Sequence, residues 1–253
     1  MVIAIANQKG GIGKTTTACA LAAILQQRGK NVLLIDSDPQ CNSTDTSRAV
    51  VEGVETLYDL LIEEGTDVRS CIQHTAPYDV IAGDGLLRDA DKLLSGVDGA
   101  YRFRERLEAI RSDYDVVVVD TPPGLGVLLT GALTAADEVI IPVTADRYAL
   151  QGMSQLTKTI RDVQRYTNKD LHITGLLVTR RTGKTTLSTE IIDGLPSFAS
   201  ELGCDVLSTS IRNTVKVQEA QAARSSVIEW APDCTAAQDY VALVDELTAK
   251  GVL

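Results

Sequence analysis

The sequence has few aromatic residues, no excess of basic residues and no long apolar run. Aromatic side chains make up 4% of the 253 residues, so Val, Ile, Leu and Ala must build the core, as is typical of buried parallel sheets. The net charge is −10, and an acidic chain is a poor nucleic-acid ligand unless basic residues gather locally. No stretch approaches the roughly 20 apolar residues of a membrane-spanning helix. The opening run MVIAIA is too short for a signal-peptide core and lacks a basic segment, which favours a strand.

The cysteines form no recognisable ligand or disulfide pattern. Their number is odd, none belongs to a C-x-x-C pair, and no His lies beside any of them: Cys19, Cys41, Cys71, Cys204 and Cys234. This pattern predicts reduced thiols in a cytosolic protein, most of them small core residues.

Apolar, β-rich runs recur along the chain at fairly even spacing. They cover residues 2–6, 31–36, 78–83, 114–120, 138–143 and 172–179, with weaker runs at 204–209 and 226–230. Helical patterns lie between them, such as residues 15–30, where Gly29 is a stop signal. This alternation predicts βαβ crossovers: an α/β fold with a mainly parallel, twisted sheet and helices on both faces. No linker or repeat divides the chain, so we expect a single domain over residues 1–253.

The string GKTT occurs twice, and the first copy lies in NQKGGIGKTTT (residues 7–17). It follows a predicted strand and precedes a predicted helix, which is the context of a phosphate-binding loop. Lys14 would neutralise phosphate oxygens and the Thr15 hydroxyl would bind Mg²⁺. The backbone N–H groups that can wrap a phosphate belong to Gly10, Gly11, Ile12 and Gly13. The chain is therefore expected to be a P-loop NTPase.

The first copy departs from the strict pattern G-x-x-x-x-G-K-[ST]. Gln8 stands where the first Gly is required, and a second lysine, Lys9, begins the loop. A Gly-rich turn with incidental lysines is the alternative, and the flanking strand and helix argue against it.

Three carboxylates follow predicted strands. Asp36 ends the run at 31–36 and Asp38 follows it two residues later, while Asp120 ends the run at 114–120. At the carboxyl edge of a parallel sheet, such groups can hold Mg²⁺ or orient an attacking water. Strand-end Asp residues that only cap the next turn are the alternative, strongest for Asp36.

These motifs together resemble the ParA family, the deviant Walker-type ATPases of plasmid and chromosome partition. The resemblance is carried by KGGIGKTT (9–16), LLIDSDPQ (33–40) and VVVVDTPPGLG (116–126), and it continues through residues 135–156 and 211–221. It covers nearly the whole chain. Since the first strand begins at residue 2, the sequence resembles the small type without an N-terminal helix-turn-helix domain.

The resemblance implies a role for each site residue. Lys9 would reach across an ATP-bound sandwich dimer to the partner's nucleotide. Lys14 would be the P-loop lysine and Asp38 the residue that supports hydrolysis, so the expected catalytic residues are Lys9, Lys14 and Asp38. Mg²⁺ would be bound by Thr15, Asp36 and Asp120. ATP would contact the loop through Lys9, Gly10, Gly11, Ile12, Gly13, Lys14, Thr15 and Thr16.

The resemblance also implies how the protein works. ATP and Mg²⁺ would drive homodimerisation and binding to nonspecific double-stranded DNA, and slow hydrolysis, stimulated by a ParB-type partner, would reset the cycle. No arginine is obviously poised to meet transition-state charge, which fits weak basal ATPase activity. Such a protein is cytoplasmic and associates with the nucleoid.

The second GKTT lies in TRRTGKTTLS (residues 179–188). Gly183 is the only glycine there, and one glycine cannot form a nest of curled N–H groups, so no second phosphate loop is expected. The net charge of residues 161–224 is +2 against −12 elsewhere. By resemblance, we expect DNA contacts from Arg180, Arg181, Lys184, Lys216 and Arg224. A solvated charge cluster is the alternative.

One segment departs from the family pattern near the base of the nucleotide. Many members have Ile-Pro-Arg-Asn where this chain has Ile211, Arg212, Asn213 and Thr214. Arg212 thus stands where the family has Pro. By resemblance we expect adenine contacts from Arg212 or Asn213, and Thr179 would form another wall of the base pocket.

The same residues bear on several rival functions. A MinD-like membrane ATPase would end in a basic amphipathic helix, whereas here Tyr240, Leu243, Val244 and Leu247 form a stripe expected to dock on the core. The cysteines do not fit an iron–sulfur reductase, and no C-terminal Tyr cluster suggests a tyrosine kinase. A relative that positions a protein complex instead of DNA stays open.

Overall fold

The computed structural model describes residues 1–94, 97–145, 153–183 and 186–253. Eight strands form one sheet in the order β3-β4-β2-β5-β1-β6-β7-β8. Neighbouring strands are parallel except β3 and β4 at one edge. This confirms the expected α/β fold. The strands are β1 (Val2–Ile5), β2 (Val32–Asp36), β3 (Ile72–His74), β4 (Asp79–Ile81), β5 (Val116–Asp120), β6 (Glu138–Thr144), β7 (His172–Arg181) and β8 (Val206–Arg212).

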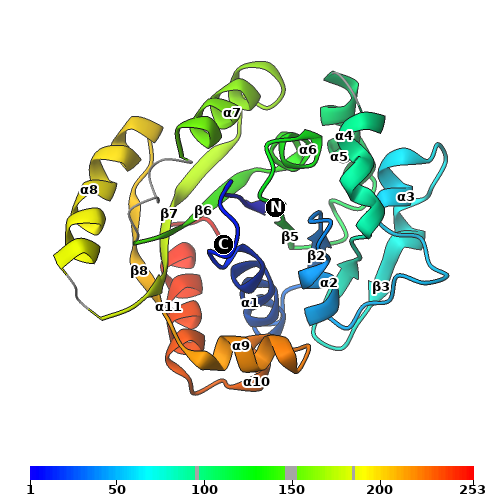
Figure 1. Ribbon diagram of the computed structural model, residues 1–253. Helices are drawn as coiled ribbons and strands as arrows, with labels where there is room; N and C mark the ends of the chain where they lie inside the picture. Colours follow the sequence, from blue (N-terminus) through cyan, green and yellow to red (C-terminus); the bar gives the residue numbers. More distant parts are fainter. Residues whose placement is uncertain (95–96, 146–152, 184–185) are drawn as a thin grey trace.

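Helices cover both faces of the sheet (Figure 1). On one face lie α1 (Lys14–Gln27), α9 (Val215–Ala222), α10 (Val227–Trp230) and α11 (Thr235–Ala249). The opposite face is covered by α3 (Leu57–Ile62), α4 (Ala90–Leu93), α5 (Val97–Glu108), α6 (Val127–Ala135), α7 (Met153–Tyr166) and α8 (Thr186–Leu202). Shorter pieces are α2 (Asn42–Thr46) and the 3₁₀ helices η1 (Val68–Cys71) and η2 (Gly85–Asp89).

The core consists of two apolar layers, one on each face of the sheet. Successive strand residues enter opposite layers, so Ile3 and Ile5 belong to one layer and Val2 and Ala4 to the other. Because both faces are covered, the central strands β1, β2 and β5 are buried along their whole length. That burial explains why these strands are continuous apolar runs rather than alternating ones.

Helix α1 ends where the sequence predicted a stop. Gly29 has a φ of 80°, a conformation that favours glycine. The Gly29 N–H donates to the Gln26 carbonyl at 2.9 Å, and the Lys30 N–H donates to the Leu25 carbonyl at 3.1 Å. These bonds satisfy carbonyls that the helix end would otherwise leave open.

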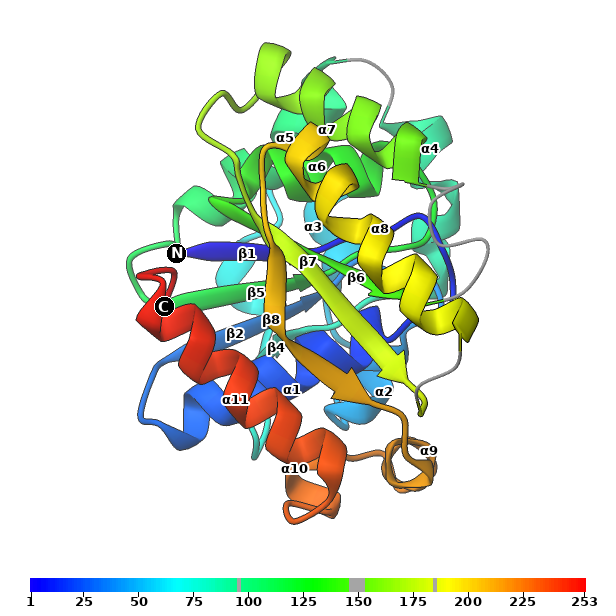
Figure 2. The ribbon, with the colours of Figure 1, turned by 90° about the vertical axis from the view of Figure 1, so that its left-hand side faces the viewer.

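The C-terminal helix α11 docks on the core, as predicted. Tyr240, Leu243, Val244 and Leu247 are all buried, and α11 packs against α1 and β8. Figure 2 shows both chain ends at the edge where the strands begin, opposite the carboxyl edge of the sheet. Within the described residues, no helix combines the length and apolar character needed to cross a membrane.

Two local predictions fail at the margins of the fold. Residues 226–230 were expected to form a strand, but Val227–Trp230 is helix α10. A capping box forms there, in which the Ser226 side chain caps the helix and Glu229 reaches back to the Ser226 N–H, and it outweighs the β propensity of Val and Ile. Edge strand β3 was missed because its three residues are too short to form a pattern.

Candidate nucleotide-binding site

The loop between β1 and α1 curls at two glycines. Gly11 has a φ of 70°, and Gly13, which precedes α1, has a φ of 93°. A residue with a Cβ is strained in this left-handed region. The two turns lead the chain into the N-terminus of α1, whose first N–H groups are the usual binding partners of a phosphate.

Lys14 is buried although it carries a charge. Its side chain donates from Nζ to the Lys9 carbonyl at 3.0 Å, across the mouth of the loop, and the residue is 6% exposed. Burial lowers the pKa of Lys14, and the nearby carboxylates of Asp120 and Asp38 oppose that shift. A buried ammonium among carboxylates and loop carbonyls is well placed to interact with an anion at this position.

Lys9 lies at the outer end of the loop. Its N–H donates to Asn7 Oδ1 at 3.0 Å, and its Nζ donates to Thr144 Oγ1 at 3.3 Å, at the end of β6. Asn7 is fixed in turn by a 2.6 Å bond from Nδ2 to the Pro142 carbonyl. The end of β6 therefore positions Lys9.

Asp36 and Asp38 occupy different environments. Asp36 is completely buried, and its Oδ2 accepts hydrogen bonds of 2.7 Å from both the N–H and the hydroxyl of Thr44. Its Oδ1 accepts from the Asp38 N–H at 3.1 Å. Asp38 lies at the cavity described below and accepts from the Gln40 N–H at 3.0 Å. Asp36 thus holds the turn that presents Asp38.

Asp120 is a buried carboxylate with unsatisfied oxygens. The residue is 0% exposed, and neither Oδ atom has a hydrogen-bond partner within the described chain. Burial raises the pKa of Asp120 to about 8, and the negative charges of Asp36 and Asp38 add to the effect, while the Thr15 hydroxyl and the Lys14 ammonium oppose it. Buried oxygens of this kind need a cation or a donor, and Mg²⁺ prefers oxygen ligands.

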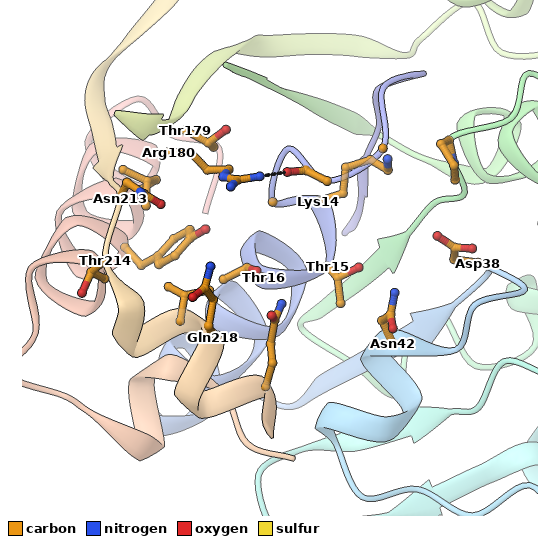
Figure 3. A pocket seen from close by; sticks show the side chains of 18 of the residues that line it. Lys14, Thr15, Thr16, Asp38, Asn42, Thr179, Arg180, Asn213, Thr214 and Gln218 are labelled. Atoms are coloured by element: carbon orange, nitrogen blue, oxygen red, sulfur yellow. Dashed lines mark hydrogen bonds between the residues drawn. The ribbon is translucent and has the colours of Figure 1, made fainter. Parts of the chain in front are cut away.

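A cavity of about 360 Å³ lies along the loop. Figure 3 shows Lys14, Thr15 and Asp38 at one end of it, and Asn213, Thr214 and Gln218 at the other. One end therefore offers the loop N–H groups, an ammonium and carboxylates, which suit phosphates and a metal. The other end offers amides and the side chains of Ile211, Val217 and Tyr240, which suit a base.

Thr179 lies between these two ends. Its hydroxyl, which is buried, bonds to the Ile12 carbonyl at 2.6 Å and to the Val143 carbonyl at 3.2 Å. The side chain therefore ties β6 and β7 to the phosphate loop and contributes to the cavity wall.

Arg212 and Asn213 line the cavity, but the Arg212 guanidinium is held elsewhere. It forms an ion pair with Asp239 of α11, with Nη2 to Oδ1 at 2.7 Å and Nε to Oδ2 at 2.9 Å. The Arg212 N–H also donates to Asp239 at 2.8 Å. Asn213 donates its N–H to the Arg181 carbonyl at 2.9 Å, and the residue lines the cavity.

Each predicted DNA-binding residue that the structure describes has a partner within the chain. Lys216 pairs with Glu219 at 2.7 Å and Arg224 with Asp45 at 2.7 Å. Arg181 donates to Ser210 Oγ at 3.0 Å, whereas Arg180 donates to the Gly11 carbonyl of the phosphate loop. Lys184 lies outside the described residues.

Several cavity residues were not found from the sequence. Tyr240 is one, since its stripe on α11 indicated only packing; its hydroxyl lies 3.1 Å from Thr17 Oγ1 on α1. The polar ones among the others lie in or next to segments that carry the family resemblance, but no role was assigned to them: Gln40, Asn42, Thr214, Gln218 and Gln221. For Tyr240 the available signal was an apolar stripe that contains one Tyr, and for Gln40 it was its place at the end of the segment 33–40.

The fold and the loop define a P-loop NTPase. The AAA_31 family model, described as an AAA domain, matches residues 1–173. The sporulation initiation inhibitor protein Soj of Bacillus subtilis is 39% identical over 99% of both chains. The chromosome partitioning protein ParA of Caulobacter vibrioides is 37% identical over 98% of this chain and 94% of its own. The chain belongs to the ParA/Soj family of ATPases.

A solved structure supports the same relationship. Cobyrinic acid a,c-diamide synthase from Mycobacterium smegmatis, with bound ATP analogue and magnesium, is 30% identical with a TM-score of 0.85. The match covers 99% of this chain and 94% of that protein. Nucleotide and Mg²⁺ binding thus occur in a relative with the same fold.

Proposed function

We propose that this chain is an ATP-dependent DNA segregation ATPase that acts as a single ParA-type domain over residues 1–253. ATP and Mg²⁺ drive a sandwich dimer that binds DNA nonspecifically, and slow hydrolysis returns it to the monomer. The observation that carries this proposal is the loop, where buried Lys14 lies beside the unsatisfied carboxylate of Asp120. DNA segregation as the process is proposed because the relatives include a chromosome partitioning protein, ParA, and the protein Soj.

The phosphates of ATP bind the loop residues, and the base lies toward α9. Lys14 and the N–H groups of the loop meet the phosphate oxygens, and Lys9 meets the nucleotide of the partner subunit. Thr179, Asn213 and the backbone of Arg212 contribute to the base end. The nucleotide-binding residues that we assign to the loop are Lys9, Gly10, Gly11, Ile12, Gly13, Lys14, Thr15 and Thr16.

The donor set fits Mg²⁺ through Thr15 and Asp120. Within the described residues, no cluster of three or more His, Cys, Asp or Glu side chains could hold a metal. Mg²⁺ needs no such cluster, since it is commonly bound by one or two carboxylates together with substrate phosphates. Asp36 supports this site from its bonds with Thr44 and Asp38. When bound, Mg²⁺ neutralises charge on the β- and γ-phosphates.

Asp38 is the residue we assign to hydrolysis. It lines the phosphate end of the cavity, and a carboxylate there can orient the attacking water and accept its proton. Lys9 and Lys14 stabilise the charge on the transferred phosphate. A carboxylate and two lysines are a modest catalytic set, which accounts for slow turnover and for stimulation by a ParB-type partner.

To bind DNA, a basic residue that is paired with a carboxylate must give up this ion pair for a DNA phosphate. The pairs Lys216–Glu219 and Arg224–Asp45 are exposed, and exposed ion pairs contribute little stability. DNA phosphates can therefore compete for Lys216 and Arg224, and the family resemblance adds Arg181 and Lys184 to the proposed DNA contacts. The resulting affinity is independent of DNA sequence and sensitive to salt. Such binding suits a cytoplasmic protein that uses the nucleoid as a track.

Light scattering tests the proposed switch. The Asp38→Ala variant should form a dimer with ATP and Mg²⁺ and a monomer with ADP. Adding Lys9→Ala should weaken the dimer without abolishing nucleotide binding, while Lys250→Ala at the far end of α11 serves as a matched control. The same mass with ATP and ADP would refute the ATP-driven dimer.

The alternative is a MinD-like or cargo-positioning ATPase. Its membrane form is disfavoured because the apolar stripe of α11 is already buried against α1 and β8. Flotation with vesicles of anionic lipid distinguishes the two functions. ATP-dependent flotation without DNA binding would favour the membrane function, whereas binding of neither would leave cargo positioning.

A further inference from the structure

Strand β7 contains an irregularity beside the phosphate loop. Val178 pairs with Ser210 and Arg181 pairs with Arg212 on β8. Strand β7 therefore takes three residue steps where β8 takes two, which places one extra residue in β7. Arg180, inside this bulge, has a φ of 52°, a left-handed conformation that costs free energy for any residue with a Cβ.

The bulge directs two successive side chains to the same loop. In a regular strand, Thr179 and Arg180 would point to opposite faces of the sheet. Here Thr179 Oγ1 donates to the Ile12 carbonyl at 2.6 Å, and Arg180 Nη1 donates to the Gly11 carbonyl at 2.5 Å. Bulges near binding sites commonly redirect a side chain in this way.

The Arg180 side chain lies at the boundary of two cavities. It lines the nucleotide cavity together with Lys14, and it also lines a cavity of about 370 Å³ on the side of Lys9. Figure 3 shows the Arg180 guanidinium reaching the loop near Lys14. Both cations donate to loop carbonyls, Lys14 to Lys9 and Arg180 to Gly11. A guanidinium has five N–H donors, so donors remain for a second acceptor.

The geometry points to Arg180 as a phosphate-binding arginine that acts within its own chain, a role that rests on the proposed nucleotide site. When nucleotide binds, the Arg180 guanidinium donates to an oxygen of the phosphate chain. It does so either in place of its bond to the Gly11 carbonyl or in addition to it. This assignment separates Arg180 from Arg181, which the sequence grouped together as DNA contacts. It also supplies the arginine near the phosphates that no sequence motif indicated.

Equilibrium titration with a nonhydrolysable ATP analogue and Mg²⁺ tests this role. Arg180→Ala and Arg180→Gly should raise the Kd by about 10- to 100-fold, the loss expected for a charge-assisted hydrogen bond. Arg181→Ala removes the same charge one residue away and should change the Kd by less than about twofold. Arg180→Lys keeps the charge but not the planar fork, so its Kd should lie between those of wild type and Arg180→Ala.

Thermal unfolding without nucleotide separates phosphate binding from a purely structural latch. Arg180→Gly relieves the left-handed backbone, so its unfolding temperature should match or exceed that of wild type while its shift on adding the ATP analogue shrinks. A wild-type Kd in Arg180→Ala, an equal loss in Arg181→Ala, or a lower unfolding temperature in Arg180→Gly would overturn the assignment. If the wild-type chain itself fails to bind the analogue, the proposed nucleotide site fails with it.

Discussion

Asp36 and Asp120 are register partners on the neighbouring parallel strands β2 and β5, and both are completely buried. Asp36 accepts hydrogen bonds from Thr44 and from the Asp38 N–H. Within the described chain, neither oxygen of Asp120 has a partner. The two neighbouring carboxylates thus differ in environment: Asp36 holds the turn, whereas the buried oxygens of Asp120 need a cation or a donor.

This difference predicts a pH-dependent stability. The pKa of Asp120 is raised to about 8, so the nucleotide-free folded state binds a proton more tightly than the unfolded state. The free energy of unfolding should therefore fall as pH rises from about 4 to about 8. Asp120→Asn removes this titration and should be the more stable protein above pH 8, by roughly 2–5 kcal/mol.

Urea denaturation across this pH range, without nucleotide or Mg²⁺, measures the effect. The curve of unfolding free energy against pH should be flatter for Asp120→Asn than for wild type. Parallel curves would mean that Asp120 does not carry the raised pKa.

Lys14→Ala should abolish detectable nucleotide binding. The variant removes the buried ammonium that donates across the loop, and loss of a charged donor together with desolvation of the remaining carboxylates should weaken binding about 100-fold or more. Fluorescence titration with a labelled ATP provides the measurement. Lys250→Ala, at the opposite edge, is the control, and binding that survives Lys14→Ala would argue against phosphates in this loop.

Asp38→Ala should separate binding from hydrolysis. Because Asp38 lines the cavity at the phosphate end without filling it, ATP affinity and dimerisation should persist while turnover falls by about 100-fold or more. Phosphate release measures turnover, and Asp89→Ala, which removes a surface pair with Lys92, is a control of the same residue type. Normal turnover would remove Asp38 from the mechanism.

Most of the fold could be predicted from the sequence, and so could the residues that the structure brings together at the proposed phosphate end of the cavity. Buried parallel strands are continuous apolar runs, and the loop glycines, Lys14 and the strand-end carboxylates follow strands in the spacing typical of a phosphate-binding loop. The base end was harder to predict, because Gln218 and Gln221 belong to α9, where no pattern distinguishes a cavity residue from a solvated one.

The direction of Arg180 could not be predicted either. Adjacent arginines on a strand are expected to point to opposite faces, but which one meets the loop depends on the bulge opposite β8. A bulge arises from the register of two strands that are distant in sequence, so residues 179–188 alone do not encode it.

Lys216→Ala combined with Arg224→Ala should weaken DNA binding and leave basal ATPase activity intact. Each phosphate contact that is removed should reduce the slope of log K against log salt concentration by about one unit. Binding to fluorescent duplexes over a salt series gives this slope. An unchanged slope would exclude both residues from the interface.

The most direct test of the central claim is the affinity for a duplex of random sequence, measured by fluorescence anisotropy with the Asp38→Ala variant. With ATP and Mg²⁺ the protein should bind this DNA tightly at physiological salt, and with ADP and Mg²⁺ it should bind weakly or not at all. Equal affinity in the two nucleotide states would contradict the proposal that ATP binding at this loop controls DNA binding.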